Sequence, residues 1–250
     1  MIDAARIAEG KWWQRPWSLV DWCTPVSEGC ENCWARAMAR RFKPGISRVI
    51  PRSDRLDIPP RVRKPTLWAV WNDLFHEDVS AAFIRGAHGT ICNTPQHHYA
   101  ILTKRPQRII ATWDKLKPTL PNAWLGTTVE NQEHEWRIGE LLKYPASLRF
   151  LSLEPLLGPI DFTAWTTYLG GALRPAYQKL HWVIVGGESG SKRRPCKLEW
   201  VESVVGQCRV AGVPVFVKQL HLSGTVVSDM AHPQWPTWAV REMPAGVEVR

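Results

Sequence analysis

The chain has 250 residues, of which 44% are hydrophobic, so it can bury a substantial core within one domain. Its formal net charge of +9 favours an anionic partner, and nucleic acid is the first candidate. No apolar run approaches the roughly 18–20 residues of a membrane span, and no secretory signal opens the chain. We therefore expect a cytoplasmic protein, without a membrane partner, whose six cysteines stay reduced.

Three of the cysteines lie close together, in a C-x6-C-x2-C pattern formed by Cys23, Cys30 and Cys33. Thiolates are the ligands that soft metals and iron–sulfur clusters use. Structural zinc would need a fourth ligand. Cys92, Cys196 and Cys208 lie far along the chain with no paired spacing, and Cys208 fits the apolar face of its helix, as a core residue does. The conceivable fourth ligands are His76, His97, His98 and His181. Taken alone, the pattern leaves a zinc site and a three-cysteine iron–sulfur cluster both open.

A helix is expected directly after the third cysteine, because Trp34, Met38 and Phe42 repeat every four residues. Pro44 and Gly45 would end it. The segment 46–65 that follows holds six basic residues, two acidic residues and four prolines, which predicts irregular structure. Two interpretations stay open for this segment: a solvated loop, or an arm that contacts phosphates.

From residue 66 onward, apolar runs alternate with helical patterns as in repeated βα units. The runs begin at residues 66, 99, 123, 149, 181 and 214. Such units build a parallel sheet with right-handed crossovers. We predict a single α/β domain over residues 1–250, a partial or irregular (βα) TIM-like barrel with six clear strands and one doubtful strand at 17–22. A doubly wound open sheet is the alternative, and residues 221–250 form a C-terminal extension without a clear pattern.

Polar residues directly follow each predicted strand: Asn72, Asp73, Lys104, Thr127, Thr128, Glu154, Glu188, Lys218 and Gln219. In α/β folds the carboxyl ends of the strands form the active face. Lys104 and Glu154 are the candidates for catalysis on this face. Gly186 and Gly187 would allow a ligand close to the backbone, and the carboxylate of Glu188 could hold an ammonium group. Each residue alone is ordinary loop chemistry, but six such sites in succession predict an active face.

Six motifs occur in order over roughly residues 17–220: 23–35, 102–107, 124–130, 149–159, 182–190 and 211–219. With these motifs the chain resembles the phage Gp37/Gp68 family (DUF5131), proteins related to the radical S-adenosylmethionine enzymes. The cysteine spacing differs from the C-x3-C-x2-C that is usual in the wider superfamily. An aromatic residue usually precedes the last cysteine there, whereas here Asn32 precedes Cys33 and Trp34 follows it.

The resemblance implies that Cys23, Cys30 and Cys33 hold a [4Fe–4S] cluster with one iron open to S-adenosylmethionine. The cluster would pass one electron to this ligand, whose cleavage gives an adenosyl radical. The residues expected to contact the cofactor are Trp34, Asp73, Thr127, Glu154, Gly186, Gly187 and Glu188.

The expected function is that of a phage-associated radical S-adenosylmethionine-like enzyme, in the host cytoplasm if phage-encoded. Its expected partners are a nucleic acid or nucleotide substrate, modified or repaired at a base, and a reductant protein. The oligomeric state does not follow from the sequence. Lys192, Arg193 and Arg194 could hold phosphates or form a solvated basic loop. The alternative function is a non-catalytic zinc- or cluster-binding protein that interacts with nucleic acid.

Overall fold

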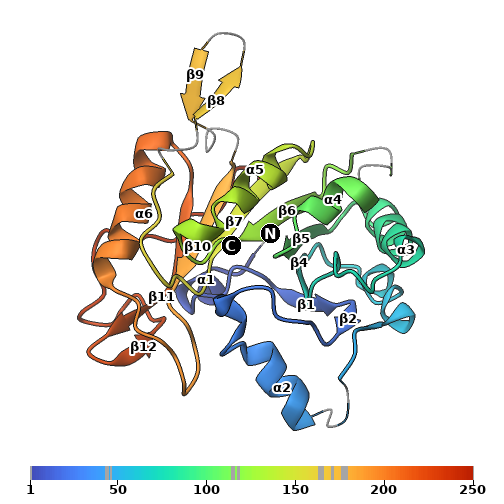
Figure 1. The fold of residues 1–250 in the computed structure, drawn as a ribbon, viewed down its shortest axis with the longest axis horizontal. Helices are drawn as coiled ribbons and strands as arrows, with labels where there is room; N and C mark the ends of the chain where they lie inside the picture. Colours follow the sequence, from blue (N-terminus) through green and yellow to red (C-terminus); the bar gives the residue numbers. More distant parts are fainter. Residues whose placement is uncertain are drawn as a thin grey trace.

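The centre of the molecule is a curled, eight-stranded sheet with the strand order β1-β4-β5-β6-β7-β10-β11-β12 (Figure 1). The computed structural model describes residues 2–42, 45, 47–113, 116, 119–162, 166–169, 172–175 and 180–249, with the backbone alone for 166–169 and 172–175. The strands of this sheet are β1 (Arg15–Ser18), β4 (Leu67–Trp71), β5 (His98–Thr103), β6 (Ala123–Thr128), β7 (Leu148–Leu153), β10 (Trp182–Gly186), β11 (Val215–Leu222) and β12 (Thr225–Val227). All neighbours pair in parallel except β12, which is antiparallel to β11.

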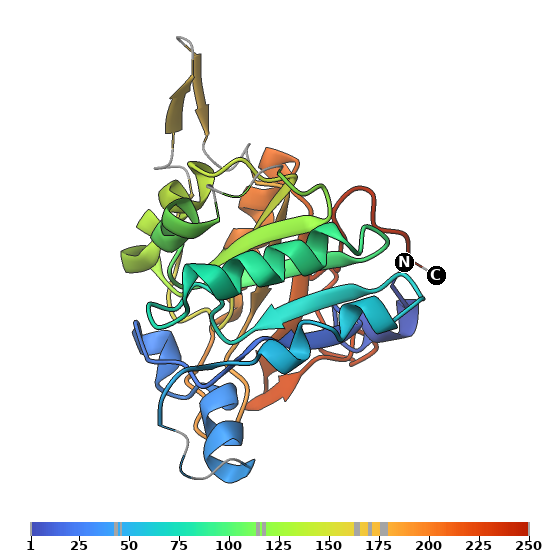
Figure 2. The same ribbon diagram turned by 90° about the vertical axis from the view of Figure 1, so that its right-hand side faces the viewer.

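Helices cover the outer face of the sheet, so that the strands form a half-barrel (Figures 1 and 2). They are α3 (Ala81–Cys92), α4 (Gln107–Thr112), α5 (Trp136–Leu142) and α6 (Leu198–Ala211). Helix α1 (Ala4–Ala8) lies near the N-terminus, and α2 (Trp34–Phe42) projects beyond the sheet. Two small pairs complete the fold: β2 (Val20–Asp21) with β3 (Ile50–Pro51), and β8 (Thr166–Leu169) with β9 (Ala172–Pro175). No helix in the described part of the chain has the length and apolar character needed to cross a membrane.

The structure confirms the α/β class and all six predicted strands, whose observed starts differ by at most one residue from those expected. The strands follow one another in chain order across the sheet, whereas a doubly wound sheet reverses its order at a switch point. The doubtful strand at 17–22 is wrong in its bounds. Trp22 has a positive φ of 69°, and the chain there divides into β1 and the separate short strand β2.

Aromatic side chains fill the inner face of the half-barrel. Trp12, Phe150 and Trp182 pack together there, with the rings of Trp12 and Trp182 centred 5.5 Å apart. The C-terminal extension, which showed no pattern in the sequence, supplies β12 and then returns to the N-terminus, where Ile2 bridges Val249. The two ends of the chain therefore lie side by side (Figure 2).

Gly126, in the middle of β6, is predicted to be intolerant of any side chain. A Cβ atom at this position would lie 2.4 Å from Cζ of Phe150. We expect Gly126→Ala to lower the free energy of unfolding by about 1–3 kcal/mol, the usual cost of overpacking a core. Urea denaturation measures this. The control is Gly206→Ala in α6, where nothing lies within 4 Å of the added Cβ and alanine should not destabilise. Equal stability of the two variants would contradict the prediction.

Candidate functional site

A cavity of about 930 Å³ opens at the carboxyl ends of the strands, beneath α2. Eight of the eleven site residues expected from the sequence line it: Cys23, Cys30, Cys33, Trp34, Asp73, Lys104, Glu154 and Glu188. The cysteine loop (residues 23–33) and the polar strand ends thus form two walls of one cavity. The fold brings them together because parallel strands end at a common edge.

The other three expected residues lie outside the cavity lining. Thr127 is fully buried, and its hydroxyl donates to the carbonyl of Thr103 at 2.9 Å. The two glycines leave room for strand β11. A Cβ on Gly186 would lie 3.3 Å from Cγ of Gln219, and one on Gly187 would lie 2.5 Å from Nε2 of His221. These glycines therefore serve packing between β10 and β11.

Glu130, just beyond β6, is hydrogen-bonded to Ser27 in the middle of the cysteine loop. Its fully buried carboxylate accepts a hydrogen bond from Ser27 Oγ at 2.5 Å, another from Lys104 Nζ, and a third from Arg137 Nη1 at 2.7 Å. Burial opposes its ionisation, but the charges of Lys104 and Arg137 lower the pKa of Glu130 below its usual value. Gly29 is required for this contact, because a Cβ there would lie 2.5 Å from the Glu130 carboxylate.

Glu188, after β10, fastens the far end of the loop. It accepts hydrogen bonds from Asn32 Nδ2 at 3.1 Å and from Arg194 Nη2 at 2.8 Å. Arg194 also donates to the carbonyl of Glu28 at 2.9 Å. Burial opposes ionisation here too, and the hydrogen bonds from Arg194 hold the pKa of Glu188 below its usual range. The carboxylate expected to hold a ligand's ammonium group is therefore bound to the protein's own cation.

Arg105, after β5, fastens the start of the loop. The guanidinium is buried and donates to Asp73 at 2.9 Å, to Glu77 at 2.8 Å and to Thr24 Oγ1 at 2.9 Å. Its Nη1 lies 3.8 Å from Cys23 Sγ. Burial raises the pKa of Cys23, and the nearby Asp73 charge acts in the same direction. Three strand ends, those of β5, β6 and β10, therefore fix the cysteine loop over the cavity.

The thiols of the chain differ in how readily they ionise. Burial opposes ionisation of Cys30, but the charge of Lys104 and hydrogen bonds from Val26 and Ser27 lower its pKa. Burial raises the pKa of Cys196 and of Cys208 to about 12. The latter two are therefore core residues, as the position of Cys208 on its helix predicts.

Of the four histidines considered as fourth ligands, His97, His98 and His181 lie at the amino-terminal edge of the sheet, whereas His76 lies beside the cysteine loop. His97 Nδ1 accepts from the backbone of Thr66, and His181 Nδ1 accepts from Arg149, both at the amino-terminal edge of the sheet. His98 begins β5 at the same edge. His76 lies beside the cysteine loop, with Nε2 2.7 Å from Thr24 Oγ1.

Three soft donors on one cavity wall have the chemistry of a cluster site. All six cysteines are free. Within the described residues, no three His, Cys, Asp or Glu side chains are placed to hold one metal ion. What the three cysteines share is one cavity and the thiol donor type that clusters use.

The remaining wall is aromatic. Trp34 packs edge-on against Trp71 with centroids 4.9 Å apart, and Trp71 packs against Trp13 at 5.2 Å. Lys218 Nζ lies 5.7 Å from the Trp13 ring and pairs with Glu154 at 2.5 Å. Both charges of this pair line the cavity and are partly exposed.

Glu130, Arg105 and Asn32 are site residues that the sequence did not single out. Arg105 directly follows Lys104, and Glu130 lies two residues after Thr128, so both lie next to predicted strand-end residues without being among them. The available signal was therefore their closeness to a strand end. Their contact with the cysteine loop depends on side-chain packing between distant segments.

The fold and the site define an α/β half-barrel protein whose strand-end cavity is walled by a three-cysteine loop. The chain belongs to DUF5131, a family of proteins of unknown function, whose family model matches residues 8–236. Neither the curated proteins nor the solved structures with which the chain was compared contain a match.

Proposed function

We propose that this chain is a cytoplasmic iron–sulfur enzyme of the radical S-adenosylmethionine type, akin to the phage Gp37/Gp68 proteins, that modifies or repairs nucleic acid or a nucleotide. The observation that carries the proposal is the position of all three motif cysteines on the wall of one cavity, at the carboxyl ends of the half-barrel strands. That edge is where α/β folds place their active sites.

Cys23, Cys30 and Cys33 would hold the [4Fe–4S] cluster. When bound, the cluster supplies one electron for the cleavage of S-adenosylmethionine, and a reductant protein replenishes it. Hydrogen bonds with Glu130, Glu188 and Arg105 hold the cysteine loop in place. A loop held by buried ion pairs keeps its ligands oriented, as a preorganised site requires.

The ion pair of Glu154 and Lys218 suits the amino-acid end of S-adenosylmethionine. That end carries an ammonium and a carboxylate, and the cavity wall here offers one carboxylate and one ammonium. The aromatic wall of Trp13 and Trp71, beside Lys218, offers an apolar surface for the adenine. Glu154 would then contact the cofactor, as expected from the sequence, whereas the Glu188 carboxylate binds Asn32 and Arg194.

The metal and sulfide content of protein purified without oxygen tests the proposal. After reconstitution we expect about four irons and four sulfides per chain, with an absorption band that bleaches on reduction by dithionite. The reduced protein should then convert S-adenosylmethionine to 5′-deoxyadenosine. Stoichiometric zinc without iron uptake would instead support the non-catalytic zinc-binding alternative. A reducible cluster that neither binds nor cleaves S-adenosylmethionine would leave a cluster-binding protein.

A further inference from the structure

Exposed apolar side chains are concentrated at the mouth of the cavity. Ten large apolar side chains of the described residues are exposed, and five of them line this cavity: Val26, Trp34, Met38, Phe42 and Ile58. Trp34, Met38 and Phe42 form one stripe along α2, with exposed fractions of 47%, 49% and 62%. An apolar group of this kind at a cavity mouth marks a binding surface.

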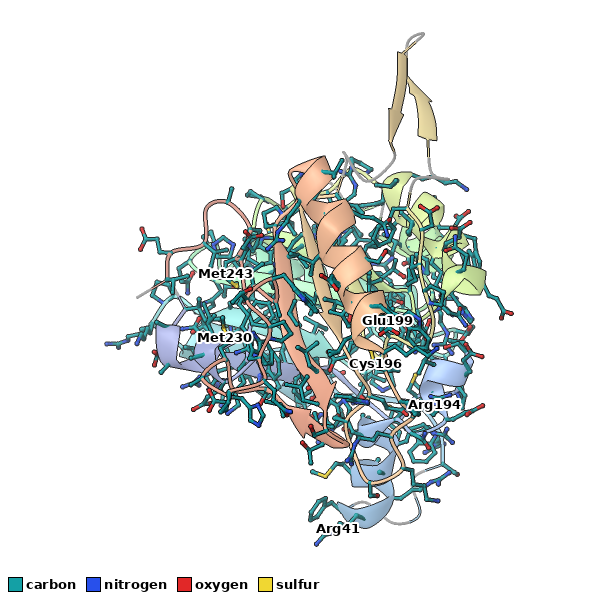
Figure 3. The ribbon with its side chains drawn as sticks, turned by 90° about the vertical axis from the view of Figure 1, so that its left-hand side faces the viewer. Arg41, Arg194, Cys196, Glu199, Met230 and Met243 are labelled. Atoms are coloured by element: carbon teal, nitrogen blue, oxygen red, sulfur yellow. The ribbon has the colours of Figure 1, made fainter. Side chains whose placement is uncertain are left out.

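The charges at the same mouth are unequally paired. Every carboxylate that lines the cavity has a cationic partner, in the pairs Asp21–Arg52, Asp73–Arg105, Glu154–Lys218 and Glu188–Arg194. In the described part of the chain, Arg36, Arg40 and Arg41 of α2 have no carboxylate partner; Arg36 lines the cavity, whereas Arg40 and Arg41 lie outside its lining. Figure 3 shows Arg41 at the outer end of α2, on the side of the molecule where Arg194 also lies. Helix α2, above the cavity, thus keeps positive charge that no acidic residue of the described chain neutralises.

We propose that this mouth binds single-stranded nucleic acid, with an unpaired base stacked on Trp34 and the backbone phosphates along Arg36, Arg40 and Arg41. The inference rests on the proposed function, because it names the class of substrate that the same cavity would bind. Trp34 is held by its edge contact with Trp71, yet almost half of it is exposed. Aromatic rings beside unpaired cations are how proteins bind single strands without a sequence code.

A single strand fits these observations better than a duplex or a protein. The cavity is recessed between α2 and the strand ends, and a base within a duplex reaches such a cavity only after it is flipped out of the stack. A protein partner could cover the apolar stripe, but the three arginines on the same helix favour a polyanion. Nucleic acid supplies both a flat apolar ring and a phosphate at each repeat.

Equilibrium binding of labelled single strands, followed by fluorescence anisotropy, tests the inference on the anaerobically purified full chain. The probes are oligothymidylate and oligouridylate of about 12 nucleotides, within the site sizes of single-strand binders. We expect Trp34→Ala to weaken binding about 5- to 150-fold, the loss of one stacked base. The matched control is Trp136→Ala, a tryptophan of α5 that is 44% exposed and lies outside the cavity lining.

A second pair of variants tests the phosphate contacts. Arg40→Ala should weaken binding of every sequence and reduce the slope of log K against log salt by about 0.7, the loss of one phosphate contact on a single strand. Arg85→Ala removes an exposed arginine from α3, on the outer face of the sheet, and should leave affinity and slope unchanged. A blunt duplex of the same length should bind less tightly than the single strand.

Equal affinities of the Trp34 and Trp136 variants would overturn the inference, as would a duplex that binds as tightly as the single strand. Absence of binding at low salt would overturn it as well. Because this assay needs no turnover, its failure is distinct from failure of the proposed function. Protein that takes up a cluster and cleaves S-adenosylmethionine, yet does not bind single strands, would refute this inference alone.

Discussion

Replacing Glu130 with alanine is expected to lower the free energy of unfolding by about 3–5 kcal/mol, as is usual when one partner of a buried ion pair is removed. The fully buried carboxylate joins Ser27 of the cysteine loop to Lys104 and Arg137. Without this carboxylate, the buried Arg137 guanidinium loses its anionic partner, and the cysteine loop loses the hydrogen bond made by Ser27. Guanidinium denaturation measures the loss. Glu140→Ala, which breaks the exposed pair with Lys143, should cost at most about 1 kcal/mol.

The pH dependence separates the charge of Glu130 from its shape. The folded-state pKa of Glu130 is lowered, so its charge stabilises the protein above the unfolded pKa of about 4.3, and this contribution is lost as the pH falls through the folded pKa. Glu130→Gln keeps the volume and removes the charge. The stability difference between wild type and Glu130→Gln should therefore be present at neutral pH and shrink in acid. A difference that does not change with pH would contradict the role assigned to the charge.

The sheet could be predicted from the sequence because each buried parallel strand is a continuous apolar run. Leu67–Trp71 and Trp182–Gly186 are examples, and their polar strand ends marked the edge that holds the cavity. β12 was missed, although Ser223 and Gly224, both with positive φ, form a two-residue hairpin turn between β11 and the β-branched residues of β12. The local signal thus sufficed wherever a strand is covered on both faces.

The roles of individual site residues were harder to predict than their location. Glu188 and Glu154 both follow strands and look equivalent in the sequence. Glu188 binds Arg194 and Asn32, whereas Glu154 pairs with Lys218 on the cavity wall. The basic segment 46–65 shows the same limit. Arg52 and Arg55 pair with Asp21 of β2, which no sequence pattern links to them. The partner of a charge is set by the three-dimensional packing of segments far apart in the chain.

The largest functional effect is expected from the motif cysteines. Changing Cys23, Cys30 or Cys33 singly to alanine should abolish iron and sulfide incorporation, because a cluster on three protein thiolates cannot be held by two. Cys92→Ala is the matched control. Cys92 is an exposed free cysteine at the end of α3, outside the cavity, and its removal should leave the iron content unchanged. Iron and sulfide assays on anaerobically reconstituted protein give the readout.

A loss of iron could also follow from unfolding, so the cysteine variants need a structural readout as well. Cys23 and Cys33 lie near the surface, partly exposed, and alanine there removes little buried area. We therefore expect these two variants to unfold within about 1 kcal/mol of the metal-free wild type while binding no cluster. Full iron content in either variant would show that the three thiols are not the ligands. Iron lost equally from Cys92→Ala would place the ligands outside the motif.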